Sequence, residues 1–244
     1  MSASNGGISS EDEKNFFNSV QTRFPDVIDG KIETCQFLES SRGVVGLVGS
    51  PVEEKSDVTC YIIIIIIIII IIIFSEKFGK VFAPVKYDME GNIEKLSQRY
   101  NTNVEKHTLL NDMILIEKAE GGNYATDALQ WLRRALQFIH KFLTCVLQDY
   151  QEGKKTEDLV PFLKTAYQET LEKYHGWLAQ KLFRLLSKMC PSRKELFLTL
   201  GLGRDVREEA VMRDMAIFLT SLDSNIQIIV KFYLENDLES DAKV

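Results

Sequence analysis

Three polar side chains within VKYDMEGNIEKLSQRY, residues 85–100, have a spacing that suits the binding of hydroxyl groups. Asp88, Asn92 and Lys95 follow one another at intervals of four and three residues, so on a helix they share one face. A carboxylate accepts hydrogen bonds, an ammonium group donates them, and an amide does both. Since each hydroxyl of a carbohydrate needs a donor and an acceptor, this trio could hold several hydroxyls. The alternative interpretation is a solvated helix face with a surface ion pair.

A tryptophan and a histidine further along the chain could complete such a site. Trp131 offers a flat indole ring to the C–H face of a sugar, although a tryptophan on an amphipathic helix can equally pack in a core. His175 precedes Gly176, which lets a backbone or a ligand come close. No Cys, His or carboxylate stands at ligand spacing from His175, so no metal site is predicted, and no GxSxG-like motif points to an enzyme. Trp177 is a candidate exposed anchor at an interface.

Apolar residues at spacings of three and four predict helices around all of these positions. The long periodic stretch over 158–189 contains Gly176, which suggests two helices or a bend there. Two Ser–Glu pairs, Ser10 with Glu13 and Ser192 with Glu195, fit helix-capping boxes. The expected helices begin near Ser10, Lys31 and Ser192 and cover about 85–100, 125–148, 158–189 and 207–236.

The composition places these helices in one domain. Of the 244 residues, 45% are apolar, enough for a sizeable core, and the formal net charge of −6 argues against a nucleic-acid partner. The four cysteines form no metal-ligand spacing, and the start, MSASNGGISSEDEK, has no signal peptide, so we expect reduced thiols in the cytoplasm. The predicted fold class is all-α, with about eight helices over residues 11–244 after a disordered N-terminus over residues 1–10.

Twelve consecutive isoleucines, Ile62 to Ile73, interrupt this pattern. With its flanking aromatic residues the run is shorter than the roughly 20 apolar residues of a membrane-spanning helix. As a strand it would have no fixed register, since every neighbour offers the same side chain. Removing the segment brings Val48 and Phe78 into one apolar stripe. We therefore interpret residues 49–75 as a non-native insertion, such as a retained intron.

Three of these segments, in this order, resemble the glycolipid transfer protein family. They are the D-x-x-x-N-x-x-K helix at 88–95, the ALQWLRRAL helix around Trp131 and the YHGW segment at 174–177. The likeness also includes KIETCQFLE, residues 31–39, and continues from residue 78 to the C-terminus. It implies an all-helical two-layer sandwich, interrupted by the isoleucine run, that encloses an apolar tunnel for one lipid.

The resemblance also implies a role for each polar residue singled out above. One group would bind the sugar headgroup of a glycolipid, a second would bind the amide of its ceramide, and one tryptophan would lie at a membrane-docking surface. The implied residues are Asp88, Asn92, Lys95 and Trp131 for the headgroup, Asp88 and His175 for the ceramide amide, and Trp177 for the membrane.

The function that follows is non-enzymatic transfer of glycosphingolipids between membranes. The resemblance implies a cytoplasmic monomer that contacts membranes transiently and needs no cofactor and no metal. Asn92 and Trp131 favour a sugar headgroup, because a phosphate would favour several cations instead. Two alternatives stay open: a carrier of ceramide phosphate, and a glycosphingolipid sensor that signals to a partner.

Two positions depart from the family pattern. Family members with a tyrosine two residues before the C-terminus use it near the headgroup, whereas this chain has Ala242, which offers no hydroxyl. Asp127, one helical turn before Trp131, supplies a carboxylate that can accept a hydrogen bond from a sugar hydroxyl, and not all relatives have it. We expect Asp127 to shift the headgroup preference.

Overall fold

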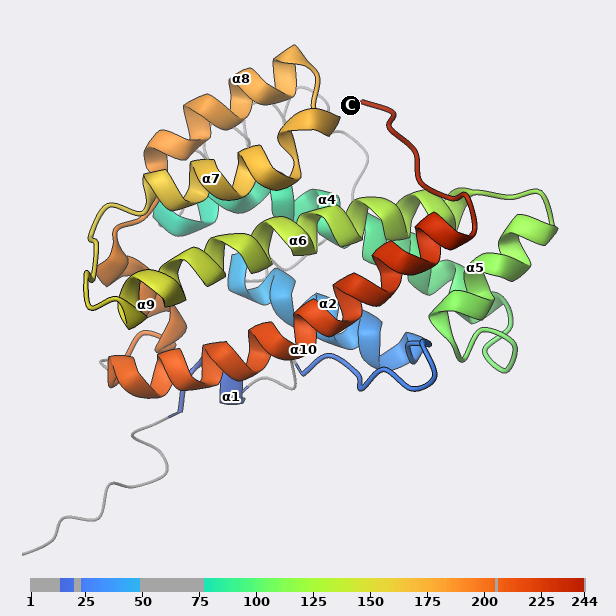
Figure 1. Ribbon diagram of the computed structural model, residues 1–244, viewed down its shortest axis with the longest axis horizontal. Helices are drawn as coiled ribbons and strands as arrows, with labels where there is room; N and C mark the ends of the chain where they lie inside the picture. The colour runs from blue at the N-terminus through green and yellow to red at the C-terminus, as the bar shows by residue number, and fades with distance from the viewer. Residues whose placement is uncertain (1–13, 20–22, 49–76, 205, 244) are drawn as a thin grey trace, which may run out of the picture.

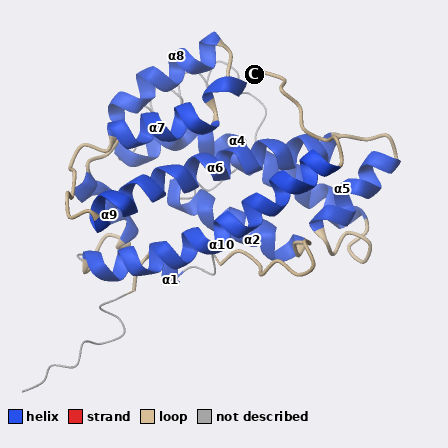
Figure 2. Ribbon diagram, viewed as in Figure 1, coloured by secondary structure: helices blue, strands red, loops and turns tan. Residues whose placement is uncertain are grey.

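The computed structural model describes residues 14–19, 23–48, 77–204 and 206–243. Within these ranges the chain forms nine α-helices and two short 3₁₀ helices, with loops between them and no strand (Figures 1 and 2). The α-helices are α1 (Phe16–Ser19), α2 (Thr34–Val48), α4 (Lys77–Thr102), α5 (Leu110–Ala119), α6 (Tyr124–Gln151), α7 (Val160–Thr170), α8 (Trp177–Leu186), α9 (Arg193–Leu200) and α10 (Glu208–Glu235). The 3₁₀ helices are η1 (Glu172–Tyr174) and η2 (Ser187–Met189).

Helix α6 is the centre of the fold. It packs against α4, α5, α7 and α10, and α2 packs on α4. In Figure 1, α7, α6 and α10 lie side by side in one layer, and α4 and α2 lie behind them in a second. The prediction of an all-α, two-layer fold is therefore confirmed. The buried apolar residues of α6 are Ala125, Ala128, Leu129, Leu132, Ala135, Leu136, Phe138, Ile139, Phe142, Leu143 and Val146.

Aromatic rings join the N-terminal part of the chain to the last helix. The ring of Phe24 lies 5.7 Å from that of Phe37 in α2 and 6.1 Å from that of Phe218 in α10. By length and apolar composition α10 alone, among the described helices, could cross a membrane. One face of α10 is instead buried in the core that it shares with α6.

A buried carboxylate fixes the start of α6. Glu117, near the end of α5, accepts hydrogen bonds from the backbone N–H groups of Ala125 and Thr126, both at 2.8 Å. The hydroxyl of Thr126 donates a third bond, also at 2.8 Å. These N–H groups have no partner inside their own helix, and a negative charge is favourable at a helix N-terminus. Helix α6 therefore begins at a defined point, which sets the position of every side chain along it.

The helix expected over 158–189 is interrupted near Gly176, as we predicted. The interruption is longer than a simple bend at the glycine. Helix α7 ends at Thr170, η1 follows, and His175 and Gly176 are extended before α8 begins. The side-chain amide of Gln180 donates to the carbonyl oxygens of Glu172 and His175 at 3.2 and 3.0 Å. These bonds hold the chain reversal together and fix the backbone at His175.

The other helix predictions are confirmed with shifted ends. The stretches expected over about 85–100, 125–148 and 207–236 are observed as α4, α6 and α10. The predicted capping box of α9 is present, because Ser192 and Glu195 exchange side-chain to backbone hydrogen bonds at 3.3 and 2.9 Å.

Other predictions have a different outcome. Helix α5 was not predicted, because its apolar residues Leu110, Met113 and Ile114 make only one short cluster. The predictions for residues 1–10, for the Ser10–Glu13 pair and for the isoleucine insertion at 49–75 lie outside the described residues.

Candidate functional site

Helices α4 and α6 run antiparallel (Figure 1), so one contact between them lets us infer the relative levels of Asp88 and Trp131. The ammonium nitrogen of Lys95 in α4 lies 5.6 Å from the ring centroid of Tyr124, at the start of α6. Asp88 lies seven residues before Lys95, and Trp131 lies seven residues after Tyr124. Seven residues are two helical turns, about 10.5 Å along each axis. Since the chains run in opposite directions, the same displacement leads from the Lys95–Tyr124 contact to both Asp88 and Trp131.

The polar residues of α4 interact with one another. Asn92 is buried one helical turn after Asp88, and its side chain favours the ionised form of the Asp88 carboxyl group. Asp88 is exposed, yet the protein atoms around its carboxyl group desolvate it and raise its pKa. The hydrogen bond from Asn92 and the charge of Lys95 oppose this shift without cancelling it. A carboxylate desolvated in this way would gain from a ligand that donates hydrogen bonds to it.

Trp131 lies between the core and the surface rather than in the core. Trp131 is half-buried, and the guanidinium carbon of Arg134 lies 4.7 Å from the centroid of the Trp131 ring. The Tyr174 ring meets it nearly at right angles, with centroids 6.4 Å apart. The Arg134 guanidinium also lies 3.5 Å from the Tyr174 ring centroid. Two neighbours thus support the indole, and one of them directly precedes His175.

His175 is held by a phenol. Its Nδ1 lies 3.0 Å from the hydroxyl oxygen of Tyr167, and the Tyr167 ring stacks on Phe183 at 3.6 Å and 7°. Desolvation lowers the pKa of His175, and burial raises the pKa of Tyr167 to about 12. A neutral imidazole therefore faces a protonated phenol at neutral pH. Among the contacts of the described residues, the ring of His175 meets Tyr167 and not Asp88 or Trp131.

The predicted exposed anchor is at the surface. Trp177 is 73% exposed, and Leu178, Leu182 and Leu185 on the same short helix α8 are 65%, 46% and 62% exposed. Two basic residues, Lys181 and Arg184, stand between these apolar side chains in the sequence. An amphipathic helix with an uncovered apolar side is typical of a surface that meets a membrane or another protein.

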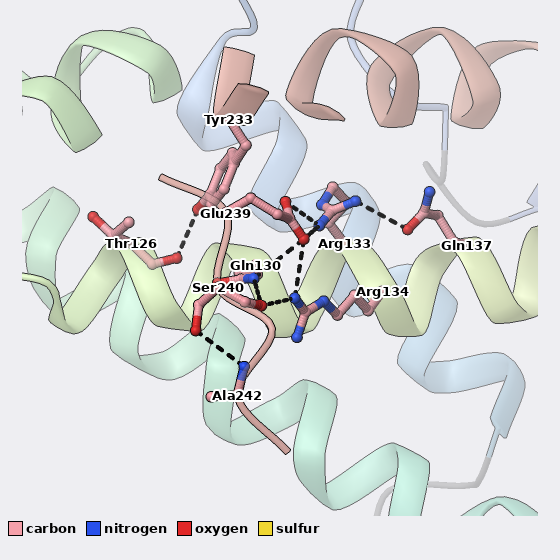
Figure 3. Close-up of polar contacts among 9 residues, drawn as sticks. All are labelled: Thr126, Gln130, Arg133, Arg134, Gln137, Tyr233, Glu239, Ser240 and Ala242. Atoms are coloured by element: carbon pink, nitrogen blue, oxygen red, sulfur yellow. Dashed lines mark hydrogen bonds and ion pairs between the residues drawn. The ribbon is translucent and has the colours of Figure 1, made fainter. Parts of the chain in front are cut away.

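The C-terminal segment at 236–243 contributes a residue that sequence analysis did not single out, Glu239. This segment crosses α6 at Gln130, Arg133 and Arg134, and its Glu239 accepts hydrogen bonds from both arginines (Figure 3). The available signal was the pair Arg133–Arg134 in an otherwise apolar stretch, because two buried cations require a buried anion. The anion's position in the sequence could not be inferred from the helix itself.

Asp127 is exposed on α6, one turn before Trp131, as its position in the sequence implied. Ala242 lies in the C-terminal segment, where its N–H donates to the hydroxyl of Ser240 at 3.2 Å. In the described part of the chain, no group of three or more His, Cys, Asp or Glu residues is arranged to hold a metal ion. The chemistry on offer is hydrogen bonding and aromatic contact.

The described residues form a two-layer helical domain, with the candidate polar and aromatic groups on α4, on α6 and in the turn before α8. The model of the glycolipid transfer protein family matches residues 67–202, more than half of the chain. The chain belongs to the glycolipid transfer protein family, which confirms the resemblance inferred from its sequence. Members of this family are lipid transfer proteins rather than enzymes.

Similar sequences and similar solved structures support this assignment to the family. Pleckstrin homology domain-containing family A member 8 of Homo sapiens is 33% identical over 241 residues, which covers 94% of this chain and 40% of that protein. The chain therefore spans about 40% of the length of the curated relatives it first matches. The structure that shows how FAPP2 selects simple glycosphingolipids with the GLTP fold is 30% identical, with a TM-score of 0.74 over 95% of this chain and 100% of that one.

The same fold also occurs with another type of lipid. Human ceramide-1-phosphate transfer protein, in complex with 12:0 ceramide-1-phosphate, is 13% identical and has a TM-score of 0.67 over 95% of this chain and 98% of that one. At this identity the likeness shows the fold alone.

Proposed function

We propose that this chain carries single glycosphingolipid molecules between membranes without changing them chemically. The observation that carries the proposal is the half-buried indole of Trp131, which Arg134 and Tyr174 support. From the antiparallel register of α4 and α6 we infer that Asp88 faces it. The carrier would act as a cytoplasmic monomer that contacts membranes transiently. FAPP2, the 30% identical neighbour, selects simple glycosphingolipids, which is the ligand class proposed here.

The sugar headgroup would bind to α4 and α6. Asn92 and Lys95 would donate to sugar hydroxyls, Asp88 would accept from them, and Trp131 would cover one face of the ring. Asp127 lies one turn away and would accept from a further hydroxyl. Each buried polar group left unmatched costs about 1–3 kcal/mol, so these few groups provide the selectivity.

The ceramide amide would bind between Asp88 and His175. Because Tyr167 stays protonated, it can donate to Nδ1 of His175, which leaves the hydrogen of the neutral imidazole on Nε2. That N–H can donate to the amide oxygen of ceramide, while the carboxylate of Asp88 accepts from the amide N–H. The two groups together match a secondary amide, which has one donor and one acceptor.

The two hydrocarbon chains would enter an apolar tunnel between the helical layers. Exposing the chains of a ceramide with about 30 methylene groups to water would cost on the order of 20 kcal/mol, at about 0.8 kcal/mol per group. A carrier must therefore bury both chains. The open hollow lined by Glu157, Asp158 and residues 188–192 does not serve this purpose, because its lining is partly charged. It lies at the C-terminal end of α6, where Arg193 binds Asp149, far along the helix from Trp131.

Trp177 and the exposed leucines of α8 would touch the membrane during loading and release. Their helix follows His175 directly, so docking would bring the bilayer surface next to the headgroup site. Apolar side chains enter the interface, and the basic residues between them meet lipid headgroups.

The Trp131→Ala chain tests the proposal. We expect this variant to lose transfer of a fluorescent glucosylceramide between vesicles while it keeps its helical circular dichroism. A matched control is Leu198→Ala, which removes an exposed large side chain from α9 and should leave transfer unchanged. Transfer by Trp131→Ala at the wild-type rate would contradict the site. Competition with ceramide phosphate in the same assay separates the two lipid classes, and tight binding without transfer would favour a sensor.

A further inference from the structure

A carboxylate from the C-terminal segment forms ion pairs with two buried arginines, Arg133 and Arg134 (Figure 3). The Nη2 atom of Arg133 donates to both carboxylate oxygens of Glu239 at 2.8 Å. The Nη2 atom of Arg134 donates to one of these oxygens at 2.9 Å and also to the carbonyl oxygen of Ser240. Gln130 completes the cluster, because its amide donates to the same carbonyl at 2.7 Å. The segment is therefore anchored by charge as well as by backbone contacts.

The cluster contacts the aromatic rings of Trp131 and Tyr174, where the headgroup is proposed to bind. The Arg134 guanidinium that binds Glu239 is the one that lies over the rings of Trp131 and Tyr174. Only 1% of Arg134 and 4% of Arg133 is exposed, so solvent screens their charges weakly. Any charge left uncompensated here would act directly on a ligand stacked on Trp131.

The balance of charge in the cluster depends on one residue. Two guanidinium groups carry two positive charges, and Glu239 is the carboxylate bonded to both. Burial would raise the pKa of Glu239, but the hydrogen bond from Arg134 and the charges of both arginines outweigh it and lower that pKa. Glu239 is thus ionised at neutral pH and cancels one of the two charges.

We propose that Glu239 determines headgroup specificity, by cancelling positive charge beside Trp131 so that the site takes a neutral carbohydrate in preference to an anionic headgroup. This inference rests on the proposed function and adds a residue 108 positions away from Trp131 to its site. Without the carboxylate, the same two guanidinium groups would offer charge-assisted hydrogen bonds to a phosphate or sulfate. A residue in the C-terminal segment would then select between lipid classes that share one fold.

The test is a competition between two lipids in the full chain. Donor vesicles contain equal amounts of glucosylceramide and ceramide phosphate with different fluorophores, and the ratio of their initial transfer rates is measured. In Glu239→Gln we expect the ratio of anionic to neutral lipid to rise at least fivefold. In Arg133→Gln, which removes one cation and keeps Glu239, the ratio should fall. In the double variant Arg133→Gln/Glu239→Gln it should return to within about twofold of the wild-type ratio.

One control variant accompanies the test. Asp241→Asn removes an exposed carboxylate from the same segment and should leave the ratio unchanged. An unchanged ratio in both single variants, or an equal loss of both lipids, overturns the inference. If Glu239→Gln loses its helical circular dichroism, the transfer ratio of Arg133→Gln is compared with that of wild type. A ratio that does not fall in Arg133→Gln then overturns the inference. A wild-type chain that transfers no glucosylceramide contradicts the proposed function, which is a different result from an unmoved ratio.

Discussion

The proposed contact between His175 and a ceramide amide depends on the neighbouring phenol of Tyr167. Tyr167 lies 3.0 Å from Nδ1, and its raised pKa, about 12, keeps it a donor. In Tyr167→Phe the imidazole loses the group that fixes its tautomer, so we expect glycolipid transfer to fall about two- to tenfold, the worth of one hydrogen bond. The measurement is the vesicle transfer rate. Tyr150→Phe, a half-buried tyrosine at the other end of α6, is the matched control. Equal rates for wild type and Tyr167→Phe would remove Tyr167 from the site.

Asp88 is expected to limit the stability of the empty protein. Its folded pKa is raised above 3.8 by desolvation, so the folded chain binds a proton more readily than the unfolded chain. The ionised form therefore costs stability at neutral pH, and this cost disappears as the pH falls through the raised pKa. Asp88→Asn should raise the melting temperature at pH 7 by about 1–3 °C, since 1 kcal/mol is worth about 2–4 °C at this size and the group is partly solvated. It should also reduce transfer.

The comparison across pH provides the check on this sign. The gap in melting temperature between Asp88→Asn and wild type should narrow towards pH 4. A variant less stable than wild type at pH 7 would show that Asp88 is a stabilising residue, contrary to its raised pKa.

At the scale of elements, the exposed apolar side of α8 should act in membrane contact and not in folding. Leu185 is 62% exposed, and burying a leucine in an interface is worth about 2 kcal/mol. Leu185→Glu should therefore weaken sedimentation with vesicles at least tenfold while the melting temperature stays within about 1 °C. Leu198→Glu on α9, 52% exposed, tests whether any exposed leucine has this effect. Loss of binding in both variants, or in neither, would contradict a docking role for α8.

The elements that periodicity could predict are those that bury one long stripe. Helices α6 and α10 were predicted almost to their ends, and the Ser192 capping box marked α9, because these signals lie within each segment. Helix α5 escaped prediction because it is short and its Glu117 is buried only through bonds to the start of α6. The sequence motifs placed Asp88, Trp131 and His175 on three separate elements. Arg134, Tyr167 and Glu239 could not be assigned to the site, since their partners are set by tertiary packing.

At the scale of the whole molecule, an ion network joins the ends of three helices. Arg193 of α9 bonds to Asp149 in α6 at 3.0 Å and to Glu208 in α10 at 3.0 Å. Burial would raise the pKa of Glu208, but hydrogen bonds from Arg193 and Lys155 outweigh it and lower that pKa. The network therefore holds α6, α9 and α10 together at the end of α6 that is far from Trp131.

A lowered pKa gives this network a defined pH dependence. Glu208 contributes stability above its ordinary value of 4.5, and that stability is lost as the pH falls through its lower folded pKa. We expect Glu208→Gln to melt below wild type at pH 7, with a difference that shrinks below about pH 4.5. Melting curves of the two chains from pH 3 to 7 give the result. A difference that stays constant with pH would contradict an ionic contribution from Glu208.

The central claim is that a sugar ring stacks on Trp131, and tryptophan fluorescence tests it most directly. The chain has two tryptophans, so Trp177→Phe leaves Trp131 as the single reporter. A short-chain glucosylceramide, which needs no membrane docking, should shift and quench the emission of Trp131, whereas the matching ceramide without sugar should leave it nearly unchanged. If the glycolipid co-elutes with the protein but the emission of Trp131 does not respond, the sugar binds elsewhere and the account is wrong.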